Sequence, residues 1–216
     1  MTISSCGKTV RTYDPDRFLL SLFVPPDKRE ALWALYAFNH EVAKTREVVT
    51  ETQLGLIRLQ WWRDVLRDFY QQKKIAANPV MESVCAAIDA HGLPQDLFDN
   101  LIYAREFDLE DRLPSNIDGM VKYAEFTHAP LFNLARSIVI PANTGIQKDV
   151  SPAYESGLAA IYALTGLLRS VPHHTRQRRC YLPEDLLRQN GITVDDLYAG
   201  KNLEKLKPAV KDIIQR

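Results

Sequence analysis

The chain has 216 residues, and its 27 Lys and Arg residues balance its 27 Asp and Glu residues, so the formal net charge is zero. A balanced charge produces no overall field for nucleic acid or anionic lipid, so any attraction to anions must be local. The three cysteines, Cys6, Cys85 and Cys180, lie far apart without a CxxC pair, which argues against a zinc site or a disulfide framework.

No stretch is apolar over the roughly 18 residues that a membrane-spanning helix requires. The N-terminal segment 1–14 lacks the apolar core of a secretory signal and the Arg-rich amphipathic pattern of a transit peptide. We therefore expect a cytoplasmic protein, or one that is peripheral at the inner membrane.

Helix boundaries are indicated along the whole sequence. A capping residue followed by proline, the expected start of a helix, occurs at Asp14-Pro15, Asn78-Pro79 and Ser151-Pro152. Residues 50–53 (TETQ) match a capping box, and helix ends are indicated at His91-Gly92 and Asn190-Gly191.

Between these signals the apolar residues recur with helical spacing. The expected helices are, in chain order, one carrying Phe18 to Phe23, then 27–49, 54–69, 80–88, 97–104, 118–140 with a kink at Pro130, 158–168, and short helices after Pro183 and Thr193. The helix at 27–49 is apolar all round, so we expect it inside the fold. On the helix at 54–69 the expected apolar stripe is Leu54, Ile57, Trp61, Val65 and Phe69. No alternating strand and no repeat occurs, so we expect an all-α chain with a flexible N-terminus at 1–12 and a single helical domain at 13–216.

A first candidate ligand site lies on two neighbouring expected helices. Its aromatic and arginine side chains are Tyr36, Arg46, Arg58, Trp62 and Arg63. They could line a pocket for an anionic or prenyl-like ligand. The alternative, which composition alone favours, is that the rings belong to the core and the arginines extend to the surface.

A second candidate site lies where an apolar stripe ends at Arg169, breaks at Pro172 and is expected to open into a basic loop. Its side chains are Arg169, His173, His174, Arg176, Arg178, Arg179 and Tyr181. Guanidinium groups match phosphate oxygens, so this cluster could bind phosphate. A metal site is disfavoured because adjacent histidines rarely share an ion. The alternative is a solvated basic loop.

Other chemistry has little support in the sequence. There is no GxSxG motif, no motif around Cys180 and no glycine-rich phosphate loop. One short basic run on a neutral chain is weak support for nucleic-acid binding, which we do not expect.

These segments resemble the squalene/phytoene synthase family. The matching segments are 31–47 (ALWALYAFNHEVAKTRE), 57–66 (IRLQWWRDVL), 123–135 (YAEFTHAPLFNLA) and 162–187 (YALTGLLRSVPHHTRQRRCYLPEDLL). The resemblance covers the chain from about Tyr13 onward and implies an isoprenoid-synthase-like fold around a central cavity. Family enzymes join two prenyl diphosphates head to head, with Mg²⁺ held by two aspartate-rich motifs.

The sequence departs from the family pattern at both motifs. The first should fall at 43–47, which reads Ala-Lys-Thr-Arg-Glu, so only Glu47 could ligate while Lys44 and Arg46 would repel Mg²⁺. Glu41 lies six residues before Glu47 and points in another direction on a helix. The second motif should fall at 170–174, which reads Ser-Val-Pro-His-His and has no carboxylate.

The resemblance, with these departures, implies a non-catalytic binding or assembly factor with no catalytic residue, metal or cofactor. The nearest branch assists the assembly of respiratory complex I, and NHEVAKTRE and HHTRQRR match it. The partners implied are a respiratory-complex subunit or a membrane surface, and a prenyl diphosphate or other anionic lipid bound by the retained arginines.

The alternative is an active prenyltransferase whose Mg²⁺ is held by other carboxylates, namely Glu106, Asp108, Glu184 or Asp185. Family members usually continue for two or three more helices, whereas this sequence stops at 211–216 (KDIIQR). The resemblance therefore implies that the last helices of the fold are missing.

Overall fold

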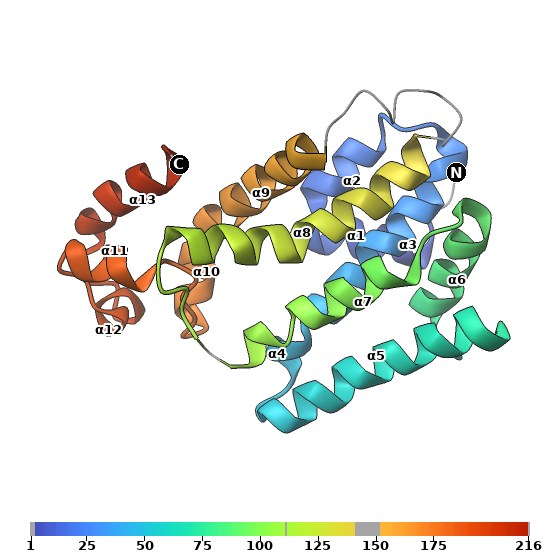
Figure 1. The fold of residues 1–216 in the computed structure, drawn as a ribbon, viewed down its shortest axis with the longest axis horizontal. Coiled ribbons are helices and arrows are strands. Elements are labelled where there is room, and N and C mark those ends of the chain that lie inside the picture. The colour runs from blue at the N-terminus through green and yellow to red at the C-terminus, as the bar shows by residue number, and fades with distance from the viewer. Residues whose placement is uncertain (1–2, 111, 141–151, 216) are drawn as a thin grey trace. The chain divides into compact units, whose positions relative to one another are not determined.

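The computed structural model describes residues 3–110, 112–140 and 152–215, with the backbone alone for 152–156. Helices make up its regular structure, and no strand occurs in these ranges, which confirms the expected all-α class. The elements in Figure 1 are α1 (Ser5–Tyr13), α2 (Pro15–Ser21), α3 (Pro26–Ala43), α4 (Thr45–Val48), α5 (Thr52–Gln72), α6 (Pro79–His91), α7 (Gln95–Ala104), η1 (Phe107–Leu109), α8 (Ile117–Val139), α9 (Pro152–Arg169), α10 (Val171–Arg176), α11 (Glu184–Gln189), α12 (Val194–Tyr198), η3 (Leu203–Lys205) and α13 (Leu206–Ile214). None of the described helices is long and apolar enough to span a bilayer.

The chain divides into two compact units. Unit 1 comprises Met1–Glu110 with Pro130–Pro152, and unit 2 comprises Asp111–Ala129 with Ala153–Arg216. The division within α8 falls at Pro130, a proline inside the helix whose missing N–H removes one helical hydrogen bond.

Two of the predicted helix caps are confirmed. A side-chain oxygen of Asp14 accepts a hydrogen bond from the N–H of Arg17 at the start of α2, and Asn78 accepts two from the first turn of α6. Gly92 ends α6 at a φ of 60°, a left-handed conformation that glycine adopts without strain. Ser151 lies outside the described residues.

The capping box predicted at 50–53 is wrong. Helix α5 begins at Thr52, and its N-cap residue Glu51 makes no side-chain capping hydrogen bond. A capping box occurs instead at α12, where Thr193 and Asp196 each accept a hydrogen bond from the other's main-chain N–H. The sequence pattern therefore located both helices but misassigned the cap of α5.

Most of the segment 1–12, which is expected from the sequence to be flexible, belongs to the helix α1. Ser4 caps this helix by accepting a hydrogen bond from the N–H of Gly7 at 3.0 Å. Cys6 and Val10, four residues apart, are buried in the core of unit 1. Gly7 allows close packing, because a Cβ there would lie 2.8 Å from a ring carbon of Trp33. The buried face is small and only weakly apolar, which is why the sequence pattern did not indicate it.

The core of unit 1 surrounds α3, as its apolar sequence predicts. The ring of Phe38 on this helix meets the rings of Trp62 and Phe98 edge to face, each with centroids 5.4 Å apart. All three side chains are buried, and they join α3 to α5 and α7.

The predicted apolar stripe of α5 is wrong in its register. Its buried residues are Gly55, Leu59, Trp62, Leu66 and Phe69, and of the predicted stripe only Phe69 is buried. The remaining stripe residues are exposed or partly exposed. The reason is that the helix packs through Gly55, where a Cβ would lie 2.6 Å from a methyl carbon of Leu109. A glycine contributes nothing to an apolar pattern, yet it decides which face can approach its neighbour.

Unit 2 has its own core. Its buried residues are Met120, Cys180, Leu182, Leu186, Leu187, Ile192, Leu197, Ala209 and Ile213. Main-chain hydrogen bonds from the N–H groups of Glu184 and Asp185 to the carbonyls of Pro114 and Ser115, at 2.9 and 3.2 Å, fix the start of α11 against the segment that precedes α8.

Candidate functional site

The structure assigns the two candidate sites of the sequence to different units, so each is described by itself. Tyr36, Arg46, Arg58, Trp62 and Arg63 belong to unit 1. The residues from Arg169 to Tyr181 belong to unit 2.

In unit 1 the aromatic members of the first set pack within the protein. Trp62 is only 1% exposed and lies in the core described above. Tyr36 packs against the edge of that core, and the guanidinium of Arg17 lies over its ring at 5.5 Å. These two rings therefore contribute to packing in unit 1, the role that composition alone favours.

Glu41 is the centre of an ion cluster at the end of α3. Its Oε1 atom pairs with Nζ of Lys44 one turn later, and its Oε2 atom lies 3.1 Å from Nη2 of Arg58 on α5. The same Arg58 nitrogen also approaches the main-chain oxygen of Glu41 at 3.5 Å. Both carboxylate oxygens are thus occupied by cations, and the cluster of Glu41, Lys44 and Arg58 has a net charge of +1.

The other arginines of the first set are also engaged. Nη2 of Arg63 lies 2.5 Å from Oε1 of Glu106, and Nη1 of Arg46 donates to the carbonyl of Val49 at 3.4 Å. The sequence did not indicate the pairing of Arg63, because 43 residues separate the two partners.

A buried arginine–carboxylate pair lies close to Glu106 in the sequence. Arg105 and Asp108 are both largely buried, and Nη1 of Arg105 lies 3.4 Å from Oδ2 of Asp108. Nη2 of Arg105 also approaches the amide oxygen of Asn39 at 3.5 Å. Glu106 and Asp108, the carboxylates named as alternative metal ligands, are therefore both paired with arginines.

In unit 2 the expected basic loop is wrong for the two histidines. Residues 171–176 form α10, directly after the end of α9, and Pro172 lies in its first turn. A proline there costs no hydrogen bond, because the N–H groups of a first turn have no helical acceptor. His173 and His174 are therefore on a helix, and the chain turns only at Arg178, whose φ is 54°.

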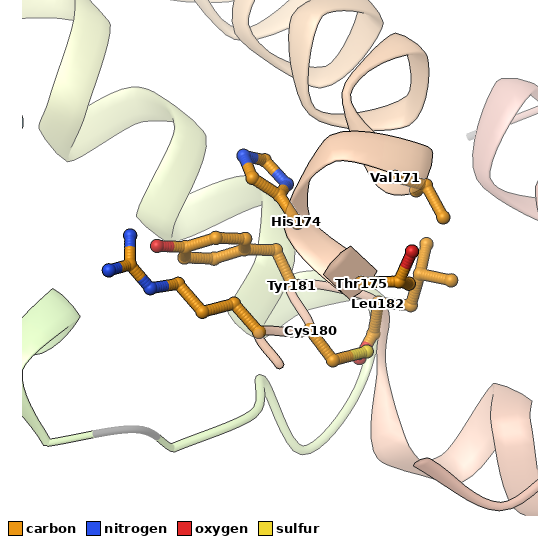
Figure 2. A pocket seen from close by; sticks show the side chains of 7 residues that line it. Val171, His174, Thr175, Cys180, Tyr181 and Leu182 are labelled. Atoms are coloured by element: carbon orange, nitrogen blue, oxygen red, sulfur yellow. The ribbon is translucent and has the colours of Figure 1, made fainter. Parts of the chain in front are cut away.

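A small pocket lies beside this turn (Figure 2). It is a shallow hollow, since the roughly 170 Å³ of space not filled by protein atoms includes open solvent, and it is lined by Val171, His174, Thr175, Arg179, Cys180, Tyr181 and Leu182. Of the predicted residues, the pocket brings together His174, Arg179 and Tyr181. It is not lined by Arg169, His173 or Arg176.

The ring of Tyr181 is held by two aromatic neighbours. It stacks on Tyr123 of α8 with centroids 5.3 Å apart, and it meets the ring of His174 at 4.8 Å. Figure 2 shows the rings of His174 and Tyr181 next to each other at the pocket. Tyr123 begins the family-like segment 123–135, but nothing in the sequence pattern indicates that it stacks on Tyr181.

Burial, with the positive charges of His173 and Arg179 nearby, lowers the pKa of His174 to about 4. The imidazole is therefore neutral near pH 7, and Arg179 supplies the positive charge of the pocket. Burial also raises the pKa of the Cys180 thiol, so this residue is a neutral thiol and a poor nucleophile.

Arg178, the remaining arginine of this segment, points to another part of unit 2. Its guanidinium lies over the ring of Tyr198 at 5.1 Å, and Nη2 is 3.9 Å from Oδ1 of Asp195. Of the arginines in the run RQRR, Arg179 therefore lies at the pocket and Arg178 is directed toward α12.

A family model described as squalene/phytoene synthase matches residues 10–216. The chain belongs to the squalene/phytoene synthase family. Similar proteins include the NADH dehydrogenase (ubiquinone) complex I assembly factor 6 of Bos taurus and of Homo sapiens, which are 28% and 27% identical over 208 residues. These matches cover 96% of this chain and 61% of each relative.

Phytoene synthases are also similar to this chain. Phytoene synthase 1, chloroplastic, of Arabidopsis thaliana is 25% identical over 215 residues, covering 98% of this chain and 50% of the relative. The chain therefore spans between half and about three-fifths of the length of these relatives.

Solved structures of the family share the fold. A dehydrosqualene synthase in complex with ligand superposes with a TM-score of 0.76 at 15% identity, covering 97% of this chain and 71% of the other. A squalene synthase from Alicyclobacillus acidocaldarius gives a TM-score of 0.70 at 21% identity, covering 97% and 76%. These structures confirm the all-α isoprenoid synthase fold.

The Mg²⁺ that the family implies does not fit the residues at the two expected motifs. Divalent magnesium requires hard oxygen ligands, chiefly carboxylates. The first motif, 43–47, has Glu47 as its one carboxylate, Glu41 just before it has both oxygens occupied by Lys44 and Arg58, and residues 170–174 offer no carboxylate. Among the residues whose side chains are described, no three His, Cys, Asp or Glu residues come together as a metal site.

Proposed function

We propose that this chain is a non-catalytic member of the squalene/phytoene synthase family that acts by binding, as an assembly factor for a respiratory complex. The observation that carries this proposal is the scarcity of carboxylates at the two motifs, since residues 43–47 hold only Glu47, residues 170–174 hold none, and the neighbouring Glu41 is already paired with cations. Departure of diphosphate requires a divalent Lewis acid, and a glutamate that is already bound by an ammonium and a guanidinium is a poor ligand for one.

The relatives support the same proposal. The assembly factors match over nearly the whole chain, at slightly higher identity than the phytoene synthases. These relatives are complex I assembly factors, so the partner we propose is a subunit of a respiratory complex. The protein would act on the cytoplasmic side, at the surface of the inner membrane.

An anionic ligand is part of the proposal. The pocket of unit 2 is lined by one guanidinium, from Arg179, and by the phenol of Tyr181. This set suits a phosphate group without a metal, because guanidinium supplies both charge and paired donors. The class of ligand is a prenyl diphosphate or another anionic lipid.

The similarity to phytoene synthases favours one alternative, an active prenyltransferase. It would need Mg²⁺ at other carboxylates. Glu106 and Asp108 are paired with Arg63 and Arg105, and one oxygen of Asp185 accepts the N–H of Leu186 at 2.7 Å. These contacts give the alternative less support than the non-catalytic function.

Incubation with geranylgeranyl or farnesyl diphosphate and Mg²⁺, followed by measurement of released diphosphate, separates the two functions. The proposal predicts release no faster than from a heat-inactivated sample, while a phytoene synthase assayed in parallel turns over. Sustained release by this chain that EDTA abolishes would establish the prenyltransferase instead.

A further inference from the structure

The end of α2 carries an unusual concentration of exposed apolar side chains. Phe23 is 90% exposed, and Leu19, Leu20 and Leu22 are 58%, 57% and 42% exposed. These four residues, which we call the apolar tip, lie where α2 ends and the chain turns into α3 (Figure 1). Single exposed apolar residues are common on proteins, but four within five positions form a patch that calls for a partner.

The main-chain donors of the apolar tip are satisfied from within the protein. The N–H groups of residues 22, 23 and 24 each donate to the carbonyl three residues earlier, at 3.1–3.2 Å. The next two residues are Pro25 and Pro26, which have no N–H group. Every main-chain donor from 22 to 26 is therefore either paired or absent.

Arg29 pairs two carbonyls in the same turn. Its Nε atom donates to the oxygen of Val24 at 2.8 Å, and its Nη2 atom donates to the oxygen of Leu22 at 2.9 Å. These carbonyls lie beyond the end of α2, where the helix provides no donor for them. The same two bonds hold a guanidinium charge at the base of the apolar tip.

The apolar tip also has a rigid support. Trp33 of α3 donates its indole N–H to Oγ of Ser21 at 2.8 Å, and its ring stacks on Phe18 with centroids 5.7 Å apart. Oγ of Ser21 in turn donates to the carbonyl of Phe18 at 2.6 Å. Ser21 and Phe18 are both buried, so the residues between and after them are displayed from a fixed base.

We infer that the apolar tip inserts into the interfacial region of a lipid bilayer. Hydrocarbon offers no hydrogen-bond partners, so a segment that enters it must satisfy its own main chain; here the N–H groups of 22–24 and the carbonyls of Leu22 and Val24 meet this condition. A protein partner that pairs with main-chain groups would find few of them open here. The guanidinium of Arg29 lies where it can meet lipid phosphate once the apolar side chains are inserted.

Charge near the apolar tip is balanced, because Asp27 and Glu30 flank Lys28 and Arg29. Burial of apolar side chains, rather than attraction to anionic lipid, is therefore the main source of affinity. The inference deepens the proposed place at a membrane surface but does not depend on the non-catalytic role, since an active enzyme could attach to a membrane in the same way.

Co-flotation of the full chain with lipid vesicles tests the inference. We expect wild type to float with phosphatidylcholine vesicles and with vesicles containing phosphatidylglycerol, and 0.5 M NaCl to reduce binding by less than about twofold. The double variant Leu22→Ser, Phe23→Ser should lose about tenfold or more in vesicle affinity, because two large apolar side chains are removed. Its circular dichroism and melting temperature should be unchanged, since both side chains are exposed.

Ile57→Ser is the matched control, because Ile57 on α5 is also an exposed apolar residue. It should bind vesicles as wild type does. In a second variant, Phe23→Trp, vesicles should shift the added fluorescence to shorter wavelength. Failure of wild type to float, or equal flotation of the double variant, would overturn the inference. So would a wild-type dimer that the double variant converts to monomer without vesicle binding, because the apolar tip would then be a contact between copies.

Discussion

Glu41 and Arg58 are 17 residues apart in the sequence, yet Oε2 of the first lies 3.1 Å from Nη2 of the second. The contact links the end of α3 to α5, and Lys44 holds the other carboxylate oxygen. In the family to which this chain belongs, Mg²⁺ is expected at the segment that follows directly, 43–47. Here side-chain cations bind the carboxylate of Glu41, so its negative charge is already balanced.

The two adjacent tryptophans of α5 should contribute very differently to stability. Trp62 is 1% exposed and Trp61 is 42% exposed. We expect Trp62→Ala to lower the free energy of unfolding by about 3–5 kcal/mol through loss of burial and the cavity left behind. Trp61→Ala should cost less than about 1 kcal/mol. Urea unfolding of both variants measures the difference, and equal losses would contradict the register described for α5.

A side chain at Gly55 should cost stability, whereas one at another helical glycine should not. A Cβ at Gly55 would lie 2.6 and 2.8 Å from the two methyl carbons of Leu109. We expect Gly55→Ala to destabilise unit 1 by about 1–3 kcal/mol, because the core must shift. Gly166→Ala, where a Cβ meets nothing within 4 Å, should instead stabilise by up to about 1 kcal/mol through helix propensity. A neutral Gly55→Ala would show that α5 and η1 pack less closely than described.

Removal of the carboxylate should destabilise the protein by different amounts in the two arginine–carboxylate pairs near η1. Asp108 is largely buried with Arg105, so Asp108→Ala leaves a buried charge and should destabilise by about 3 kcal/mol. Glu106 and Arg63 are each about a quarter exposed, and Glu106→Ala should cost less than about 1 kcal/mol. Thermal unfolding compares the two variants, and a larger loss for Glu106→Ala would reverse the order.

His174 should make stability depend on pH. The pKa of His174 in the folded chain, about 4, lies below the ordinary value of 6.5. Between these two pH values the unfolded chain binds a proton at this residue and the folded chain does not. The stability that this neutral histidine contributes is full above pH 6.5 and is lost as pH falls from 6.5 toward 4. His40 and His91 also have lowered pKa values and act in the same direction.

The variant His174→Gln separates this contribution from the others. Between pH 7 and pH 4.5 its unfolding free energy should fall less steeply than that of wild type. In NMR spectra, the ring proton of His174 should titrate well below pH 6. A midpoint near 6.5 for this proton would mean that the imidazole is solvated and the pocket is open.

Several features of the fold could be predicted because they are local. The Asp14 and Asn78 caps depend on residues within one turn, and the uniformly apolar sequence of α3 indicates burial without knowledge of its neighbours. The predictions that were wrong concern places where helices approach their neighbours closely. The pattern missed α1, whose buried face is small and weakly apolar, and the buried face of α5, and both helices pack closely through a glycine, Gly7 or Gly55.

The candidate site was less predictable for the same reason. The basic segment was found by composition, but Pro172 was interpreted as a helix break when it occupies a first turn. Stacking of Tyr181 on Tyr123, and the pairing of Arg58 with Glu41, join residues that are not neighbours in the sequence. Such partners follow from how separate parts of the chain pack, Tyr181 lying between α10 and α11, and no single stretch of sequence specifies this.

A titration with Mn²⁺, a paramagnetic substitute for Mg²⁺, followed by electron paramagnetic resonance, tests most directly whether cations of the protein have taken the place of the metal. With geranylgeranyl diphosphate present, the signal of free Mn²⁺ should be the same with and without the protein, and Glu41→Gln should change nothing. Binding of one or more Mn²⁺ ions per chain, lost in Glu41→Gln, would show that this carboxylate is a metal ligand and would contradict the non-catalytic account.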